Sequence, residues 1–94
     1  MKIFLTGASG FAGFYAAMRL ATAGHTVTGV VRNPAQKRLQ ILRTLQIKLI
    51  HGDVAEPATY RDELDQCDAI VHAMLDKKRH FDTDRAFFAT LEAL

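Results

Sequence analysis

The apolar residues of this chain follow two kinds of pattern, which alternate along its length. Short, dense runs rich in β-branched and aliphatic residues are typical of strands buried on both faces, and these runs cover residues 2–6, 26–31, 47–51 and 69–74. Between the first two runs, apolar and small residues recur every three or four positions over residues 11–23, which predicts an amphipathic helix. The apolar face of that helix consists of Phe14, Ala17, Met18 and Ala21.

Helix-start signals mark the segments after the second and third predicted strands. Asn33-Pro34 combines a favoured N-cap residue with proline at the first helical position. Leucines follow this pair at threefold spacing, at Leu39, Leu42 and Leu45. Pro57 opens a short helical segment in the same way, and a last helix is expected over residues 83–94.

Strands and helices therefore alternate, with short connections between them. This order predicts parallel strands joined by right-handed crossovers, and hence an α/β fold with helices on both faces of one sheet. A chain of 94 residues that is 49% hydrophobic holds one small domain with a packed core, and two independently folding domains would not fit. Residues 1–94 are accordingly expected to form a single domain.

Charge and composition argue against several partners and sites. Twelve Lys plus Arg against ten Asp plus Glu, with a net charge of +2, do not indicate nucleic acid as a partner. The apolar runs are far shorter than the roughly 20 residues of a membrane-spanning helix, so no membrane association is expected. The single cysteine, Cys67, cannot form an internal disulfide, which favours the cytoplasm. Four histidines lack the close spacing of metal ligands, so no metal site is expected.

The glycine-rich segment from Thr6 to Gly13 lies between the first predicted strand and the first predicted helix. Here Gly7 can adopt the positive φ of a tight turn, Gly10 lets the backbone approach a pyrophosphate, and Gly13 allows close packing of helix against strand. The helix N-terminus offers unpaired N–H groups and a partial positive charge to the phosphates. The competing interpretation is a turn that only joins two elements. The flanking strand and helix favour a dinucleotide-binding, Rossmann-type unit.

A Rossmann-type unit also sets the order of the strands in the sheet. The first half of a doubly wound sheet has the order 3-2-1-4, and the four predicted strands fit that half. Strand four is then an edge strand, and its only polar side chain is that of His72. Because unpaired strand edges are templates for association, we expect the chain to form a homo-oligomer through this edge.

The residue at the end of the second strand bears on the choice between NAD and NADP. An acid there would bind the ribose 2′-hydroxyl of NAD, but the sequence reads Val31-Arg32-Asn33. The guanidinium of Arg32 has the charge and planar shape to bind a 2′-phosphate, and Lys37 or Arg38 can add positive charge nearby. NADP is therefore the expected cofactor, in preference to NAD. In the competing interpretation Arg32 is an ordinary solvated cation.

The spacing Gly-x-x-Gly-x-x-Gly behind a leading threonine resembles the short-chain dehydrogenase/reductase superfamily. Its extended or atypical branch, which includes NAD(P)-dependent epimerases and dehydratases, is the most similar. The likeness continues through residues 23–27, 51–54 and 67–73, and so covers nearly the whole chain.

This resemblance implies three sets of contacts with the dinucleotide. One pair of residues would present its backbone to the pyrophosphate, a second pair would flank the adenine, and a third would border the nicotinamide ribose. In that order, the pairs are Phe11 and Ala12, Asp53 and Val54, and Ala73 and Met74.

Catalysis in the resembled superfamily uses a Tyr-x-x-x-Lys pair, and this chain has none. Tyr15 is followed four residues later by Arg19, and Tyr60 by Leu64. No catalytic residue is therefore assigned. The chain is expected to be the N-terminal, NADP(H)-binding half of an oxidoreductase or nucleotide-sugar epimerase/dehydratase. The alternative is a non-catalytic module that senses NADP or binds a partner.

Overall fold

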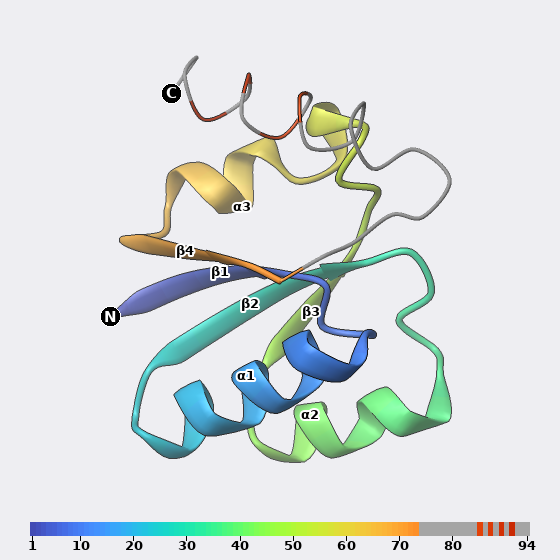
Figure 1. Cartoon of the computed structure of the whole chain (residues 1–94), viewed down its shortest axis with the longest axis vertical. Helices are drawn as coiled ribbons and strands as arrows, with labels where there is room; N and C mark the ends of the chain where they lie inside the picture. Colours follow the sequence, from blue (N-terminus) through green and yellow to red (C-terminus); the bar gives the residue numbers. More distant parts are fainter. Residues whose placement is uncertain (74–84, 86, 88, 90, 92–94) are drawn as a thin grey trace.

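A computed structural model describes residues 1–73, together with residues 85, 87, 89 and 91. Four parallel strands form one sheet in the order β3-β2-β1-β4. Figure 1 shows β1 and β2 at the centre, flanked by β4 and β3. The strands are β1 (Lys2–Thr6), β2 (Thr26–Val31), β3 (Lys48–His51) and β4 (Ala69–His72). This topology confirms the predicted α/β, Rossmann-type fold and its strand order.

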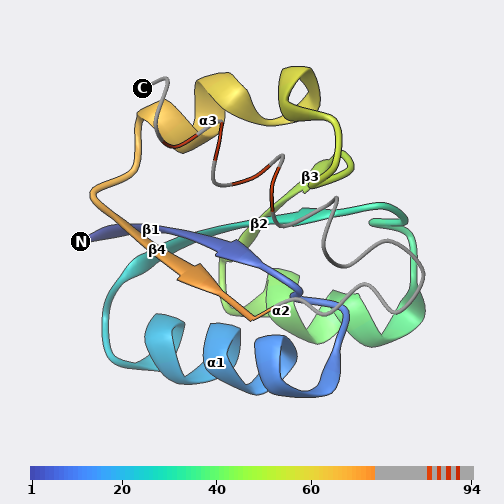
Figure 2. The same cartoon turned by 45° about the horizontal axis from the view of Figure 1, so that its top comes forward.

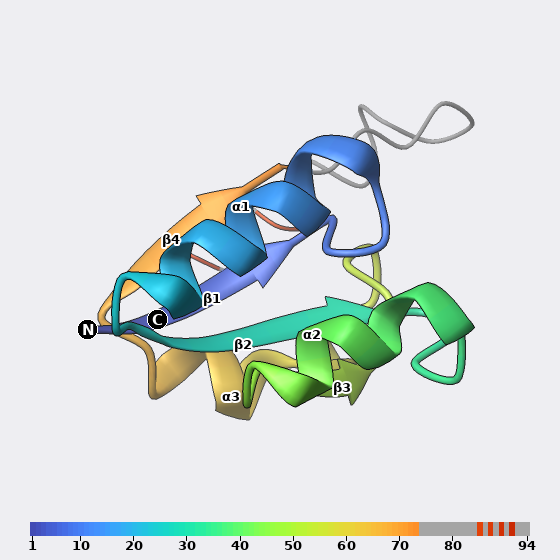
Figure 3. The ribbon, with the colours of Figure 1, turned by 90° about the horizontal axis from the view of Figure 1, so that it is seen from below.

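Helices cover both faces of the sheet, as predicted. Figures 2 and 3 show α1 and α2 on one face and α3 on the other. The helical elements are α1 (Phe11–Thr22), η1 (Lys37–Leu39), α2 (Gln40–Thr44), η2 (Pro57–Thr59) and α3 (Arg61–Asp65), where η denotes a 3-10 turn. Of the expected last helix, residues 85, 87, 89 and 91 are helical, and the other positions lie outside the described residues.

Each face of the sheet packs against its own hydrophobic cluster, which explains why the strands read as dense apolar runs. The cluster beneath α1 and α2 includes Leu5, Ala17, Val27 and Leu42, with the rest of the predicted α1 face packed against it. The cluster on the α3 face consists of Phe4, Val30, Val54, Tyr60, Leu64 and Phe87. Phe87 thus joins the last helical segment to the α3 side of the sheet.

The predicted helix start at Asn33-Pro34 is wrong. The Asn33 side-chain oxygen accepts a hydrogen bond from the Ala35 N–H at 3.2 Å, so it closes a local turn. Gln36 then has an extended ψ of 133°, and helical geometry begins only at Lys37. Of the three leucines at threefold spacing, Leu39 and Leu42 are buried, whereas Leu45 follows the end of α2 and is 37% exposed. Asparagine favours turns and N-caps alike, because its side chain bonds nearby backbone in both.

Candidate functional site

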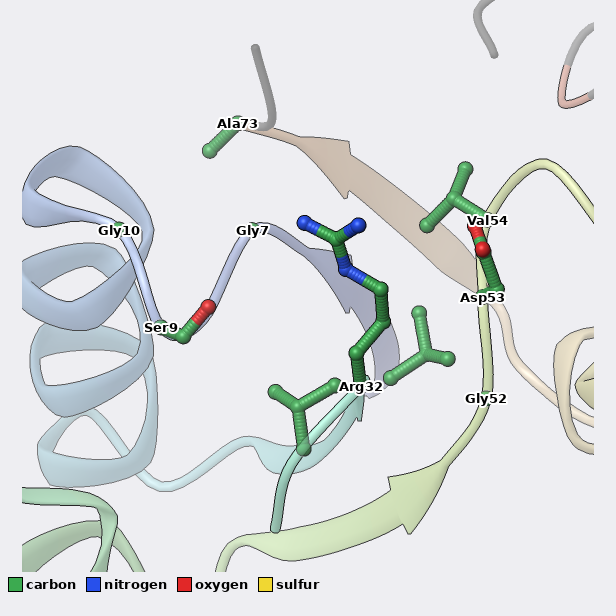
Figure 4. Close-up of a pocket in the computed structure, with 10 residues that line it drawn as sticks. Gly7, Ser9, Gly10, Arg32, Gly52, Asp53, Val54 and Ala73 are labelled. Carbon is green, nitrogen blue, oxygen red and sulfur yellow. The ribbon is translucent and has the colours of Figure 1, made fainter. Parts of the chain in front are cut away.

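An open groove of about 140 Å³ lies at the carboxyl ends of the strands, where parallel α/β sheets bind their ligands. Figure 4 shows its two sides: the β1–α1 turn on one and the segment after β3 on the other, with Arg32 between them. The lining residues are Gly7, Ser9, Gly10, Val30, Val31, Arg32, Gly52, Asp53, Val54 and Ala73.

The three glycines of the β1–α1 turn serve different structural purposes. Gly7 has a φ of 82°, a conformation that side chains with a Cβ rarely adopt, and its carbonyl accepts the Gly10 N–H at 2.9 Å. Gly13 is buried, and a Cβ there would lie 1.9 Å from the Gly7 carbonyl oxygen. Gly10 is exposed and faces the groove. Gly7 and Gly13 therefore build the turn, whereas Gly10 leaves its backbone open.

The N-terminus of α1 meets the groove at Gly10, the residue before its first turn. No side chain caps this end, and the first turn holds no acidic residue. The first two residues of the helix, Phe11 and Ala12, are exposed, and Phe11 is 80% accessible. The first amides and the positive end of the helix dipole are thus available to an anion in the groove.

Arg32 follows β2 and is exposed. In Figure 4 its guanidinium reaches upward between Gly7 and Val54, into the space bounded by the two sides. Arg38 does not share this position, because its guanidinium lies 5.0 Å from the centre of the Phe14 ring on α1. Neither Arg38 nor Lys37 lines the groove. Among the described residues, Arg32 is the cation that lines the groove.

The end of β4 forms the remaining part of the rim. Thr6 and His72 are register partners on β1 and β4, and Thr6 Oγ1 lies 2.6 Å from His72 Nδ1. The His72 ring stacks on Phe87 with centroids 4.6 Å apart. Beyond this pair, the Ala73 N–H donates to the Thr6 carbonyl at 3.3 Å, which holds Ala73 beside the glycine turn.

Most of the predicted contact residues meet at this groove. Six of them line it: Gly7, Gly10, Arg32, Asp53, Val54 and Ala73. The other predicted residues, Phe11, Ala12 and Gly13, lie on α1 and do not line the groove, while Met74 lies outside the described residues.

Four further lining residues were not predicted from the sequence: Ser9, Val30, Val31 and Gly52. Ser9 lies within the glycine turn, and the others lie at or just after strand ends. One rule could have identified them. The carboxyl ends of parallel strands meet at one edge of the sheet, so every residue at those ends is a candidate lining residue.

Two other titratable side chains, those of His25 and Cys67, do not line the groove. His25 Nδ1 is 3.2 Å from the N-terminal amine. Burial, together with the negative charges of Glu63 and Asp68, raises the pKa of the Cys67 thiol and so favours its uncharged form. The part of the chain that the structure describes holds no group of three His, Cys, Asp or Glu residues suited to a metal ion. Within the same residues, no helix is long and apolar enough to cross a membrane.

Curated relatives of this chain include reductases of much greater length. It is 36% identical over 76 residues to dihydroflavonol 4-reductase of Zea mays, a match that covers 74% of this chain and 21% of the relative. It is 35% identical over 69 residues to 2-alkyl-3-oxoalkanoate reductase of Shewanella oneidensis, covering 73% of this chain and 17% of that protein. The chain therefore spans about a fifth of the length of the relatives that it matches.

Solved structures share the fold. Leucoanthocyanidin reductase of Vitis vinifera in its binary complex with NADPH superposes with a TM-score of 0.84 at 18% identity, over 99% of this chain and 32% of that one. UDP-glucose 4-epimerase of Stenotrophomonas maltophila with bound NAD gives 0.80 at 17% identity, over 98% and 33%. The model of the NAD dependent epimerase/dehydratase family matches residues 3–91. The chain therefore belongs to the NAD dependent epimerase/dehydratase family, within the extended short-chain dehydrogenases/reductases, as the resemblance of its glycine spacing predicted.

Proposed function

We propose that this chain is the NADP(H)-binding part of an oxidoreductase that reduces a carbonyl substrate, with an epimerase or dehydratase as the alternative activity. Reductases among its curated relatives support the first activity. NADPH, when bound, supplies the hydride. The chain contributes the open backbone at Gly10, the uncapped start of α1 and the cation of Arg32. The open backbone and the helix start suit a pyrophosphate, and the cation of Arg32 suits a phosphate monoester.

The observation that carries the choice of NADP is the position of Arg32. Its guanidinium extends into the groove from the end of β2, where an acidic residue would bind the 2′-hydroxyl of NAD. A planar, permanently charged fork suits the 2′-phosphate that only NADP carries. Asp53 lines the opposite side, at the end proposed for the adenine, so its carboxylate does not take the place of that missing acid.

Replacing Arg32 with alanine is expected to weaken NADP binding selectively. Loss of a charged hydrogen bond corresponds to roughly 1.5 to 3 kcal/mol, or about 10- to 150-fold in Kd. Calorimetric titration with NADP and with NAD measures the difference. Arg19→Ala is the matched control, because Arg19 lies in the last turn of α1, at the end away from the groove. Equal weakening of both cofactors, or an unchanged NADP affinity, would contradict this role for Arg32.

We further propose that this chain is not catalytic by itself. The superfamily's Tyr-x-x-x-Lys pair is absent from its sequence, so proton transfer is assigned to residues outside it. A module that senses NADP without turnover fits the same absence and is the second candidate function. A cytoplasmic location belongs to this proposal, because a single cysteine forms no internal disulfide.

Homo-oligomerisation is also proposed, through the edge of β4. Among the strands that the structure describes, β4 pairs with β1 and lies at the edge of the sheet, and Ile70 on it is 38% exposed. We expect the 94-residue chain to scatter light as a dimer or larger species, and Ile70→Lys to shift it toward the monomer, because a charge protects a strand edge. A monomeric mass for the unsubstituted chain at every concentration would refute this assembly.

A further inference from the structure

Thr59 and Tyr60 lie where the 3-10 turn η2 gives way to α3, and both bond to the segment that forms one side of the groove. Thr59 Oγ1 accepts the Asp53 N–H at 3.0 Å. The same hydroxyl lies 2.7 Å from the Glu56 carbonyl and 3.2 Å from that of Asp53, within reach to donate. A Cβ on Gly52 would lie 2.8 Å from this oxygen. Thr59 therefore binds both ends of the turn that begins at Asp53.

Tyr60 holds the next residue of the same segment. Its hydroxyl donates a buried hydrogen bond to the Val54 carbonyl at 2.7 Å, and the residue is only 1% exposed. The ring packs against both Phe4 and Phe87, with centroid distances of 5.6 and 6.1 Å. Because the ring is fixed in the core of the α3 face, the carbonyl it holds is fixed relative to the sheet.

Neither Thr59 nor Tyr60 lines the groove, yet each bonds to a residue that does. We infer that these two hydroxyls are positioning groups that hold Asp53 and Val54 at the distance from Arg32 that the adenosine end of the dinucleotide requires. This inference rests on the proposed function, which places that ligand in the groove. If Asp53 and Val54 shift, the affinity for the dinucleotide falls even though neither residue has been replaced.

Two nearly isosteric substitutions test this inference. Tyr60→Phe removes one oxygen and keeps the ring, and Thr59→Val removes the hydroxyl and keeps the branched shape. We expect each to weaken NADP by about tenfold, as for loss of a net hydrogen bond from the bound geometry. Adenosine 2′,5′-bisphosphate, which carries only the adenosine end, should weaken by the same factor. Thr59→Ser restores the hydroxyl and should restore the affinity.

A control separates positioning from a general loss of stability. Leu42→Val truncates a buried residue in the cluster on the opposite face, so it lowers the thermal midpoint without contact to this segment. We expect this variant to bind NADP like the unsubstituted chain at 10 °C or so, well below its midpoint. Circular dichroism establishes that each variant is folded at the temperature of titration.

The possible results are distinct. If Tyr60→Phe and Thr59→Val, both folded, bind NADP as tightly as the unsubstituted chain, or no more weakly than Leu42→Val, the positioning role is refuted and the proposed function stands. Failure of Thr59→Ser to recover affinity also counts against it. If the unsubstituted chain binds no NADP, the proposed function fails and the inference fails with it.

Discussion

Gly10→Val is expected to abolish dinucleotide binding while the chain stays folded. The backbone at Gly10 has φ −85° and ψ 170°, a region that valine adopts readily. A Cβ there would meet the Gly7 carbonyl oxygen at 3.4 Å, an ordinary contact, and the rest of the side chain would extend into the groove. The added methyl groups would then occupy the space that a pyrophosphate needs to reach the first amides of α1.

The measurement is a calorimetric titration of the folded variant with NADP. Loss of binding by at least about 100-fold in Kd is expected, since steric exclusion removes several hydrogen bonds to the phosphates at once. Gly10→Ala provides the graded comparison, with a smaller loss. Retention of full NADP affinity by Gly10→Val would show that no phosphate approaches this backbone.

Gly13→Ala should instead destabilise the fold strongly. A Cβ at Gly13 would lie 1.9 Å from the Gly7 carbonyl oxygen and 2.4 Å from its carbonyl carbon. Both atoms belong to the backbone of the β1–α1 turn, so α1 must move away from the sheet to admit one methyl group. Overpacking of this kind costs about 3 kcal/mol or more when backbone atoms must shift, a large part of the stability of a small domain.

Urea denaturation followed by circular dichroism measures that cost. The control is Gly10→Ala, the same substitution three residues earlier in the same turn, which should change the free energy of unfolding by less than about 1 kcal/mol. Similar midpoints for the two variants would mean that the contact between Gly13 and Gly7 is looser than described.

The order of elements was open to prediction because it depends on local features. Dense apolar runs and helical spacing each reflect a period of the backbone, and short parallel connections leave few possible strand orders. The positive φ of Gly7 was also predictable, since a tight turn between strand and helix needs it. By contrast, Asn33 carries a signal shared by turns and helix starts, and only the extended Gln36 decided between them.

The candidate site shows the same division. Gly7 and Gly10 were identified from the glycine-rich turn between strand and helix, and Arg32 from its place at the end of the second strand; parallel strands bring these positions to one edge whatever their distance in sequence. Thr59 and Tyr60 were not, since a hydroxyl's partner depends on how the segment after β3 folds back onto α3. No spacing in the sequence marks that contact.

The sequence by itself therefore determined the α/β class, the strand order and the glycine turn, because periodicity and chain connectivity act over short distances. Tertiary structure decided which side chains meet around the sheet and its groove. The pair formed by Thr6 and His72 joins residues 66 positions apart, and Phe87 completes a cluster that begins at Phe4. Such contacts arise only when the sheet has assembled and each side chain meets whatever the packing places beside it.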